Sequence, residues 1–476
     1  MDFSLASFLP EAFQCLVALG LLLQSMSSSP SLRDDASWTP WAAAIGIGAA
    51  YKGLSATGFM FYGAYQLDAL SQFFKLAVAI GFFIATLNAV RQPTLEKEHE
   101  ADYFMFLAFS ALGLMLLASA VELVTVYVAL EISSYALYAV IPLRAADKRA
   151  AEAGIKYILF GAAATALSLY GLSYIFASQH VTYIAALAKL DWSWAHNPMA
   201  VIGLTLFLAG MFYKLALFPF HFWAPDVYQG ASNETAAFVA TLPKLGAVVV
   251  MVRLAAVAHQ SHELLTVLAV LGALSMTFGN LAALAQRDLK RMLGYSSVAH
   301  AGYVTLGLVS GSKAGLAAAA FYSLVYILMN LTCFWVLCRL ADKGQNLTYE
   351  DLDGLYKRSP WLAMVLAVAA FALVGLPPTA GFMGKLFLLT SAWNHGYDWL
   401  VIVAAVNTAF AIYYYLSMVR HAYTAEVDDP AKLAPAPVSN LSLVWGGALA
   451  VVLLILGAVP GPIFDLAMRA GAQLLP

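Results

Sequence analysis

Long apolar segments, separated by short polar connections, follow one another along the whole chain. A helix needs about 20 predominantly apolar residues to cross the hydrocarbon core of a membrane. Runs of this kind predict fourteen transmembrane helices, at residues 5–24, 41–61, 71–90, 103–120, 122–142, 154–177, 199–219, 235–257, 263–284, 293–310, 315–338, 361–391, 399–420 and 441–465. Because the connections are short, no water-soluble domain is expected. The pattern therefore predicts an all-α polytopic membrane protein.

The composition agrees with a chain that lies mostly in the lipid bilayer. Of its 476 residues, 62% are hydrophobic and 11% are charged, whereas a soluble domain has about a quarter charged residues. The net charge of −2 gives no basic patch for nucleic acid. Cys15, Cys333 and Cys338 lie in apolar runs without metal-ligand spacing, and no nucleotide-binding or zinc-protease motif is present. We therefore expect no cofactor, metal or nucleic acid to bind this chain.

Lysine and arginine are distributed unequally between the two sides of the predicted membrane. Fifteen of the 25 lie in connections that follow odd-numbered spans, whereas four, among them Arg253, are assigned to the other side. Because cytoplasmic loops are enriched in these residues, both termini are expected outside, in the periplasm of a bacterium. Lys52 and Lys75 lie near the ends of predicted spans and are expected to extend their amino groups to the membrane surface.

Two of the predicted spans, the seventh and the twelfth, are interrupted by helix-breaking residues beside a lysine. The first break lies in Lys214–Gly230, KLALFPFHFWAPDVYQG, which contains Pro219 and Pro225. The second lies in Gly375–Lys385, GLPPTAGFMGK, where two prolines and three glycines precede the lysine. A broken helix exposes unpaired backbone groups, which a membrane tolerates only beside protein or a polar cavity. We therefore expect both breaks to lie at functional positions in the interior.

The spacing of the two breaks predicts an internal repeat. Spans 4–8 correspond to spans 9–13, and an odd number of spans gives the two units opposite orientations. Residues 1–102 are then an N-terminal three-helix segment, 103–258 the first repeat, 259–425 the second, inverted repeat and 426–476 a C-terminal helix.

Glu131 lies in the middle of the fifth span, where a charge is costly. At helical spacing, Tyr127, Tyr135 and Tyr138 share its face and offer hydroxyls to a proton or water chain. Lys156, in the next span, is the expected ion-pair partner. Two compatible interpretations stay open: a structural ion pair, and a pair whose protonation changes when its separation changes.

Further ionisable residues also lie inside predicted spans. Lys214 and Lys244 flank the first break, Lys385 follows the second, and His300 lies in the tenth span. Histidine has an unperturbed pKa near about 6.5 and suits a proton relay, although an isolated buried histidine is also a common structural residue. His221, in the first break, is a further candidate, and hydrogen bonding to the broken backbone is its alternative role. Together these residues indicate that the chain moves an ion.

A set of segments spread over the whole chain carries a family resemblance. The segments are Glu131-Ile-Ser-Ser-Tyr, Ala151-Glu-Ala-Gly-Ile-Lys-Tyr, Phe212 to Gly230, Gln286-Arg-Asp-Leu-Lys-Arg-Met-Leu-Gly-Tyr-Ser-Ser with His300, Asp351-Leu-Asp-Gly-Leu, and Gly375–Lys385. They resemble the antiporter-like membrane subunits of bacterial NADH:quinone oxidoreductase (respiratory complex I). The form HFWAPDVYQG is similar to subunit N rather than to subunits M or L.

The resemblance implies a fourteen-helix subunit that moves protons from the cytoplasm to the periplasm while other subunits oxidise NADH and reduce quinone. By motif match it assigns these roles: Glu131 and Lys156 as the coupling pair, Lys214 as the lysine at the broken helix, Lys244 and His300 as relays, and Lys385 as the terminal exchange group. It places NADH, FMN, iron–sulfur clusters and quinone in other subunits, subunits M and K as neighbours, and the complex in the bacterial inner membrane. A subunit of a multisubunit (Mrp-type) cation/proton antiporter is the alternative, because such chains share this fold.

One segment departs from the pattern of the family. Members usually continue the sequence Gln-Gly-Ala with Pro-Thr-Pro, whereas this chain has Ser232-Asn233-Glu234. Ser232 or Asn233 is expected to cap the next helix, with Glu234 in its first turn. The alternative, that Glu234 adds an acid to the proton path, stays open.

Overall fold

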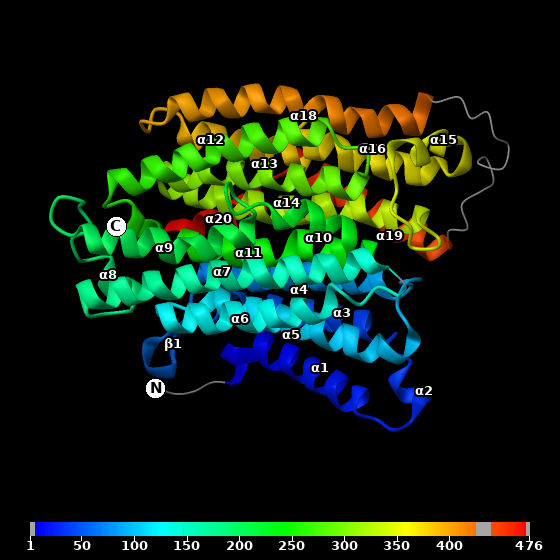
Figure 1. Cartoon of the computed structure of the whole chain (residues 1–476), viewed down its shortest axis with the longest axis horizontal. Helices are drawn as coiled ribbons and strands as arrows, with labels where there is room; N and C mark the ends of the chain where they lie inside the picture. Colours follow the sequence, from blue (N-terminus) through cyan, green and yellow to red (C-terminus); the bar gives the residue numbers. More distant parts are fainter. Residues whose placement is uncertain (1–4, 146, 425–438, 473–476) are drawn as a thin grey trace.

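The computed structural model describes residues 5–145, 147–424 and 439–472. Its long helices lie side by side along one direction, as in a bundle that crosses a membrane (Figure 1). Among the described residues, ten helices are long and apolar enough to span a membrane, and three further apolar helices are shorter. Each of the fourteen predicted spans contains a helix, so the predicted fold class is confirmed.

The structure contains a helix in each predicted span and short helices or 3₁₀ turns in several of the connections. The helices within the predicted spans are α1 (Leu9–Ser25), α3 (Thr39–Lys52), α4 (Ala69–Ala89), α5 (Glu100–Ser119), α6 (Leu123–Val140), α7 (Lys148–Gln179), α9 (Pro198–Leu215), α11 (Asn233–Ala258), α12 (His262–Leu284), α13 (Leu289–Val309), α14 (Lys313–Leu340), α16 (Pro360–Val374), α17 (Ala380–Ala392), α18 (Asp398–Thr424) and α19 (Asn440–Ala458). Shorter helices are α2 (Pro30–Arg33), α8 (Ile184–Leu187), α10 (Trp223–Gly230), α15 (Leu355–Arg358) and α20 (Gly461–Ala472). Single 3₁₀ turns lie at Leu5–Phe8, Gly53–Ser55, Phe61–Gly63, Lys97–His99 and Tyr349–Leu352. The seventh span is broken between α9 and α10 and the twelfth between α16 and α17, as the prolines and glycines predict.

The second span is shorter than its apolar run predicts. α3 ends at Lys52 rather than near residue 61, because the chain then turns into a two-stranded antiparallel hairpin, β1 (Gly58–Met60) and β2 (Tyr65–Leu67). Three consecutive residues of this turn have a positive φ, Phe61 at 49°, Tyr62 at 57° and Gly63 at 84°, and of these only glycine adopts the conformation without strain. Lys52 is exposed at the end of its helix, as expected.

Helices α11 and α14 form the centre of the bundle. All residues in their most apolar windows are buried, whereas α7 and α19 bury 28% and 33% of theirs. A helix that is apolar on all sides is buried among other helices, and α11 packs against α4, α5, α9, α13 and α14. An ionisable group on α11 is therefore shielded from solvent on every side, and this is the helix that carries Lys244.

The two broken helices enter the bundle from opposite ends. α9 begins at the end where α8 lies, and α16 begins at the other end, beside α15 (Figure 1). In chain order, α5, α6, α7, α9–α10 and α11 correspond to α12, α13, α14, α16–α17 and α18. This arrangement agrees with two five-helix repeats of inverted orientation, which bring both breaks into the interior of one bundle.

A buried ion pair joins α1 to α4 in the N-terminal segment. The Lys75 Nζ atom lies 2.5 Å from the Glu11 Oε1 atom, and both side chains are fully buried. Tyr65 donates its hydroxyl proton to the same carboxylate. The expectation that Lys75 reaches the membrane surface is therefore wrong, because a carboxylate on the neighbouring helix holds its ammonium group in the interior.

A second buried ion pair fixes the end of α11. Arg253 donates from its two terminal nitrogens to the two carboxylate oxygens of Asp68 at 2.9 and 3.0 Å, and it also donates to the Ala118 carbonyl at 2.7 Å. The Asp68 carboxylate in turn caps α4 by accepting from the Ser71 backbone N–H at 2.7 Å. Arg253 therefore lies inside the bundle and anchors α11, and it does not contribute to the charge of a surface connection as the sequence suggests.

The Glu11–Lys75 pair predicts a specific pattern of stability. Replacing Lys75 by methionine leaves the Glu11 carboxylate buried without a counter-charge, which costs about 3–5 kcal/mol. Lys75→Met is therefore expected to lower the unfolding temperature of the detergent-purified protein, followed by intrinsic fluorescence. The double variant Glu11→Gln/Lys75→Met removes both charges, keeps an acceptor for Tyr65 and should recover most of the loss. Equal unfolding temperatures for Lys75→Met and the wild type would contradict this prediction.

Candidate functional site

Five of the ionisable residues predicted from the sequence lie in the interior of the bundle. Glu131, Lys214, Lys244, His300 and Lys385 expose between 3% and 6% of their surface. Charged side chains at such positions in a membrane are costly and are usually functional. The ion pairs found among the described residues include none of these three lysines. Their hydrogen-bond acceptors are neutral groups.

Glu131 lies at a small cavity between α6, α7 and α9. The lining of the cavity includes Tyr127, Glu131, Tyr138, Thr165 and Lys214. Thr165 donates its hydroxyl proton to the Glu131 Oε1 atom at 2.7 Å. Lys214 lies within electrostatic range of Glu131. The acid and the first lysine therefore face one shared polar space.

The tyrosines predicted beside Glu131 separate into two groups. Tyr127 and Tyr138 line the cavity. Gly161 of α7 leaves room for the Tyr138 hydroxyl, which would lie only 2.3 Å from a Cβ atom at that position. Tyr135 is 60% exposed, because it lies at the edge of the shared helical face and turns toward the surface of the bundle. Two of the three expected hydroxyls are thus available to Glu131.

The structure does not pair Glu131 with Lys156, so the expected partner was wrong. The Lys156 Nζ atom lies 2.7 Å from Asp226 Oδ2 and 2.8 Å from Glu152 Oε1, and its side chain is 36% exposed. The register of the helices explains the difference. Thr165 is the residue of α7 that reaches Glu131, and Lys156 lies nine residues earlier, about 14 Å away along the helix axis.

Lys214 is the second-to-last residue of α9, immediately before the first break. Its Nζ atom donates to the Tyr157 hydroxyl at 3.1 Å and lies 5.2 Å from the centre of the Tyr157 ring. Ala216 then leaves the helix with a φ of 59°, and α10 begins at Trp223. Because the C-terminal end of a helix carries partial negative charge, the end of α9 stabilises the Lys214 ammonium group.

Lys244, on α11, approaches the same break from the other side. Its Nζ atom donates to the backbone carbonyl of Leu215, the last residue of α9, at 2.6 Å and to the Ser297 hydroxyl at 3.4 Å. The last four carbonyls of an α-helix have no partner within the helix. The break therefore supplies an acceptor that holds Lys244 without a carboxylate.

Lys385 repeats this arrangement at the second break. Its Nζ atom donates to the carbonyl of Val374, the last residue of α16, at 2.8 Å and to the Leu373 carbonyl at 3.4 Å. Gly375 ends α16 in a left-handed conformation with a φ of 88°. Lys244 and Lys385 thus have the same kind of hydrogen-bond partner, because each binds the terminal carbonyl of a broken helix.

His300 is held on α13 by hydroxyl groups from two other helices. Its Nδ1 atom is hydrogen-bonded to the Tyr322 hydroxyl at 2.6 Å, and its Nε2 atom to the Tyr415 hydroxyl at 3.2 Å. The Ser296 hydroxyl, one turn earlier on α13, is hydrogen-bonded to the same Tyr415 hydroxyl. Both ring nitrogens therefore have partners that can either donate or accept a proton.

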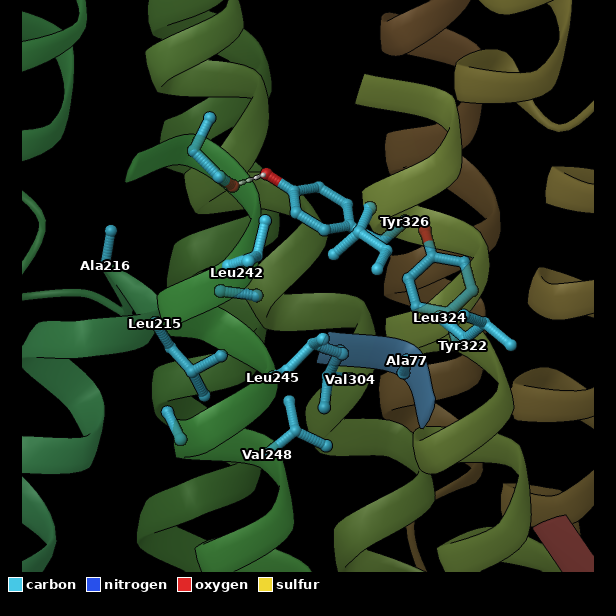
Figure 2. Packing of buried hydrophobic residues seen from close by; sticks show 14 of the residues in the cluster. Ala77, Leu215, Ala216, Leu242, Leu245, Val248, Val304, Tyr322, Leu324 and Tyr326 are labelled. Atoms are coloured by element: carbon cyan, nitrogen blue, oxygen red, sulfur yellow. Dashed lines mark hydrogen bonds between the residues drawn. The ribbon is translucent and has the colours of Figure 1, made fainter. Parts of the chain in front are cut away.

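His300 shares neighbouring groups with two of the lysines, Lys244 and Lys385. Lys244 and His300 line one small cavity together with Tyr326. Figure 2 shows Tyr326 and Leu245, which belong to the same lining. On the other side, the Tyr303 ring lies 6.1 Å from the His300 ring and 4.5 Å from the Lys385 Nζ atom. Aromatic faces stabilise nearby cations. Shared neighbours therefore connect Lys244 to His300 and His300 to Lys385, and we call these three residues the line of ionisable groups.

His221 lies apart from this line. Its ring stacks on Phe218 and packs against Phe222 and Phe278. The side chain is buried, and its Nδ1 atom has no hydrogen-bond partner. The structure brings His221 into an aromatic environment rather than to the lysines, and its part in a relay stays a prediction.

The hydroxyl partners of the site were not identified from the sequence. These partners are Tyr157, Tyr322, Tyr415 and Ser297, and Tyr326 presents its ring to Lys244. Part of the signal was present, since Tyr322 and Tyr326 are four residues apart and share a face of α14. A single tyrosine in an apolar span gives no such signal, because packing is its usual role.

Known proteins share both the sequence and the fold of this chain. A family model described as "NADH:quinone oxidoreductase/Mrp antiporter, TM" matches residues 120–411. NADH-quinone oxidoreductase subunit N 2 of Solidesulfovibrio magneticus is 63% identical over 473 residues, which cover 99% of this chain and 100% of the relative. A chain in the structure of respiratory complex I from Thermus thermophilus with bound Aureothin is 32% identical and has a TM-score of 0.84, covering 96% of this chain and 99% of that chain.

A more distant likeness extends to another kind of membrane complex. A chain of the Mrp complex from Dietzia sp. DQ12-45-1b has a TM-score of 0.85, covering 99% of this chain and 98% of that chain, but it is 20% identical. That likeness shows the fold alone. The family model covers more than half of this chain, and the relative from S. magneticus matches almost all of it. The chain therefore belongs to the family of NADH-quinone oxidoreductase subunit N, the antiporter-like membrane subunits of respiratory complex I.

Proposed function

We propose that this chain translocates protons across the membrane as a subunit of NADH-quinone oxidoreductase. The observation that carries the proposal is the line of Lys244, His300 and Lys385, in which each lysine is bound by the terminal carbonyl of a broken helix. A carboxylate partner would favour the ammonium form strongly, whereas a carbonyl carries only a partial charge. An amino group in this setting can therefore both accept and release a proton.

In the proposed direction, a proton enters from the end of the bundle where the connections rich in lysine and arginine lie, which we call the basic end. Lys214 or Lys244 then holds the proton. It passes from Lys244 through the shared cavity to His300 and then past Tyr303 to Lys385. Release from Lys385 to the other side of the membrane completes the transfer. Each step leaves a neutral amine or imidazole that can accept the next proton.

The interactions in the site are large enough for this task. Moving one charge against a potential of 100 mV requires about 2.3 kcal/mol. Glu131 and Lys214 face one cavity without forming an ion pair. An approach of the two charges to about 4 Å would gain about 4 kcal/mol at an effective dielectric constant of about 20. A change in their separation can therefore hold or free the proton on Lys214. We propose that this pair, and not Glu131 with Lys156, connects the relay to the rest of the complex.

We extend the proposal to the surroundings of the chain. The unequal distribution of lysine and arginine supports a position in the bacterial inner membrane with both termini in the periplasm. The largely exposed apolar windows of α7 and α19 offer faces for lipid and for neighbouring membrane subunits, which we propose to be M and K. We further propose that NADH, FMN, iron–sulfur clusters and quinone are bound by other subunits, since the sequence contains no motif for them.

A cation/proton antiporter subunit of the Mrp type is the second candidate function. The shared fold of the Mrp chain supports it. The 63% identity to a subunit N, against 20% to the Mrp chain, favours complex I. Genes for redox subunits beside this gene would support complex I, and a small antiporter operon would support the alternative.

Replacing Lys244 by alanine tests the relay. The variant removes the central amino group, so the number of protons taken up per NADH oxidised is expected to fall. Inverted membrane vesicles, a pH-sensitive dye and the absorbance of NADH give this ratio. Lys343→Ala is the matched control, because Lys343 is exposed in the connection after α14. An unchanged ratio in Lys244→Ala would contradict the proposed relay.

The corrected pairing predicts unequal effects for the two residues first expected to form a pair. Glu131→Gln keeps the contact with Thr165 but removes the charge that faces Lys214, so it is expected to lower the proton-to-electron ratio. Lys156→Met removes two partly exposed ion pairs, each worth about 0–1 kcal/mol, so the proton-to-electron ratio is expected to stay near that of the wild type. Both are measured in the same vesicles. A larger loss in Lys156→Met than in Glu131→Gln would show that the pairing in the working complex is different.

A further inference from the structure

Glu234 is a buried acid that the proposed relay does not use. It lies in the first turn of α11, after Ser232, whose hydroxyl accepts from the Thr235 backbone N–H at 3.1 Å. Of the two residues expected to cap this helix, Ser232 or Asn233, Ser232 is the cap. Glu234, however, is only 2% exposed, and its Oε2 atom has no hydrogen-bond partner. A first-turn acid that only favours the helix dipole would remain at the surface, so the burial of Glu234 indicates a further role.

Positive charges surround Glu234 without pairing with it. Lys290 on α13 and Arg339 at the end of α14 act on it electrostatically, as does Arg144 in the connection before α7. The ion pairs found among the described residues do not include Glu234. Lys290 instead donates to the Ala231 carbonyl at 2.7 Å. The cations stabilise a carboxylate at this position and leave it free to accept a proton.

The other groups around Glu234 lie on α14, α5 and α4. Cys338 of α14 and Tyr103 of α5 are its remaining titratable neighbours. Asn88 of α4 donates to the Cys338 Sγ atom at 3.2 Å, and the hydroxyls of Thr235 and Tyr103 are hydrogen-bonded at 3.2 Å. Polar side chains from several helices thus converge on the first turn of α11, at the basic end of the bundle.

Helix α14 packs beside α11 over the distance between Glu234 and Lys244. Lys244 lies ten residues after Glu234, about 15 Å along α11. α14 runs past α11 from the Tyr326 hydroxyl, which donates to a backbone carbonyl of α11 at 3.2 Å (Figure 2), to Cys338 beside Glu234. Asn330 lies between these two positions on α14. Its Nδ2 atom donates to the Tyr326 carbonyl at 3.1 Å, and its Oδ1 atom is buried without a partner.

We propose that Glu234 loads Lys244 with protons from the basic end of the bundle. This proposal rests on the proton-translocating function proposed above. In this proposed proton path, the unpartnered oxygens of Glu234 and Asn330 lie in the part near Glu234. The Tyr326 ring, 5.8 Å from the Lys244 Nζ atom, lies in the part near Lys244. Buried polar atoms without protein partners are places where proteins hold internal water. Hydroxyl groups and such water can carry a proton over this distance.

The proposed step conserves protons and charge. The neutral Glu234 carboxyl group releases a proton into the hydroxyl and water chain, and the neutral Lys244 amine takes up a proton at the other end and becomes an ammonium group. The carboxylate that remains is stabilised by Lys290, by Arg339 and by the unpaired N–H groups at the start of α11. It then takes a proton from water at the basic end, which restores the carboxyl group.

A purely structural counter-charge is the alternative role for Glu234. A counter-charge for Lys290 and Arg339 stabilises the fold, and its loss lowers the amount of assembled complex. A loading group governs the supply of protons, and its loss has the largest effect where protons are scarce. The pH profile of pumping therefore separates the two roles.

The test uses the assembled complex in inverted membrane vesicles, with Glu234→Gln, Glu234→Asp and Lys244→Ala in this chain. Proton uptake per NADH oxidised is measured from pH 6.5 to pH 8.5, and native gels give the amount of assembled complex. Glu234→Gln keeps the Ser232 cap but cannot carry a proton, so the ratio should fall several-fold at pH 8.5 and less at pH 6.5, with normal assembly. Glu234→Asp should restore most of the wild-type profile.

Glu263→Gln is the matched control, because Glu263 is an exposed acid in the first turn of α12. It should keep the wild-type ratio at every pH. A wild-type ratio and pH profile in Glu234→Gln, with Lys244→Ala impaired, would overturn the role of Glu234 and leave the relay intact. Poor assembly of Glu234→Gln with an unaltered pH profile would also overturn it, in favour of the structural role. A wild-type ratio in Lys244→Ala would overturn the relay itself.

Discussion

The attraction between a lysine ammonium group and the free carbonyls at the end of a broken helix governs the functional part of this structure. Lys244 donates to Leu215 at the end of α9, and Lys385 donates to Val374 at the end of α16. These carbonyls are free because the last turn of a helix has no internal partners for them. The breaks in the two inverted repeats therefore provide the same weak acceptor twice, and His300 shares neighbouring groups with both lysines that use it.

Helix α11 divides its charges between anchoring and transport. Near one end, Arg253 forms a bidentate ion pair with Asp68 and fixes the helix to α4. In the middle, Lys244 has no carboxylate partner, and at the other end Glu234 has no ion pair among the described residues. Because α11 is buried on all sides, each of these charges is controlled by protein groups alone. Ion pairs thus hold the scaffold, and unpaired charges remain available for protons.

The fold was predictable because each of its features rests on a local pattern. Apolar runs set the number of spans, prolines and glycines marked both breaks, and charges such as Lys244 stood out in apolar surroundings. The pairings were not predictable, because they depend on the rotation and the relative height of the helices. Lys156 follows Glu131 by one helix but lies at a different height, and Lys75 finds its partner Glu11 two spans away in the chain.

A density map of the assembled complex that resolves ordered water would test the central claim most directly. The relay predicts water molecules that join Lys244, His300 and Lys385 into one hydrogen-bonded line, with the two amino groups still at the carbonyls of Leu215 and Val374. A dry, apolar separation between His300 and either lysine in every state of the complex would contradict it.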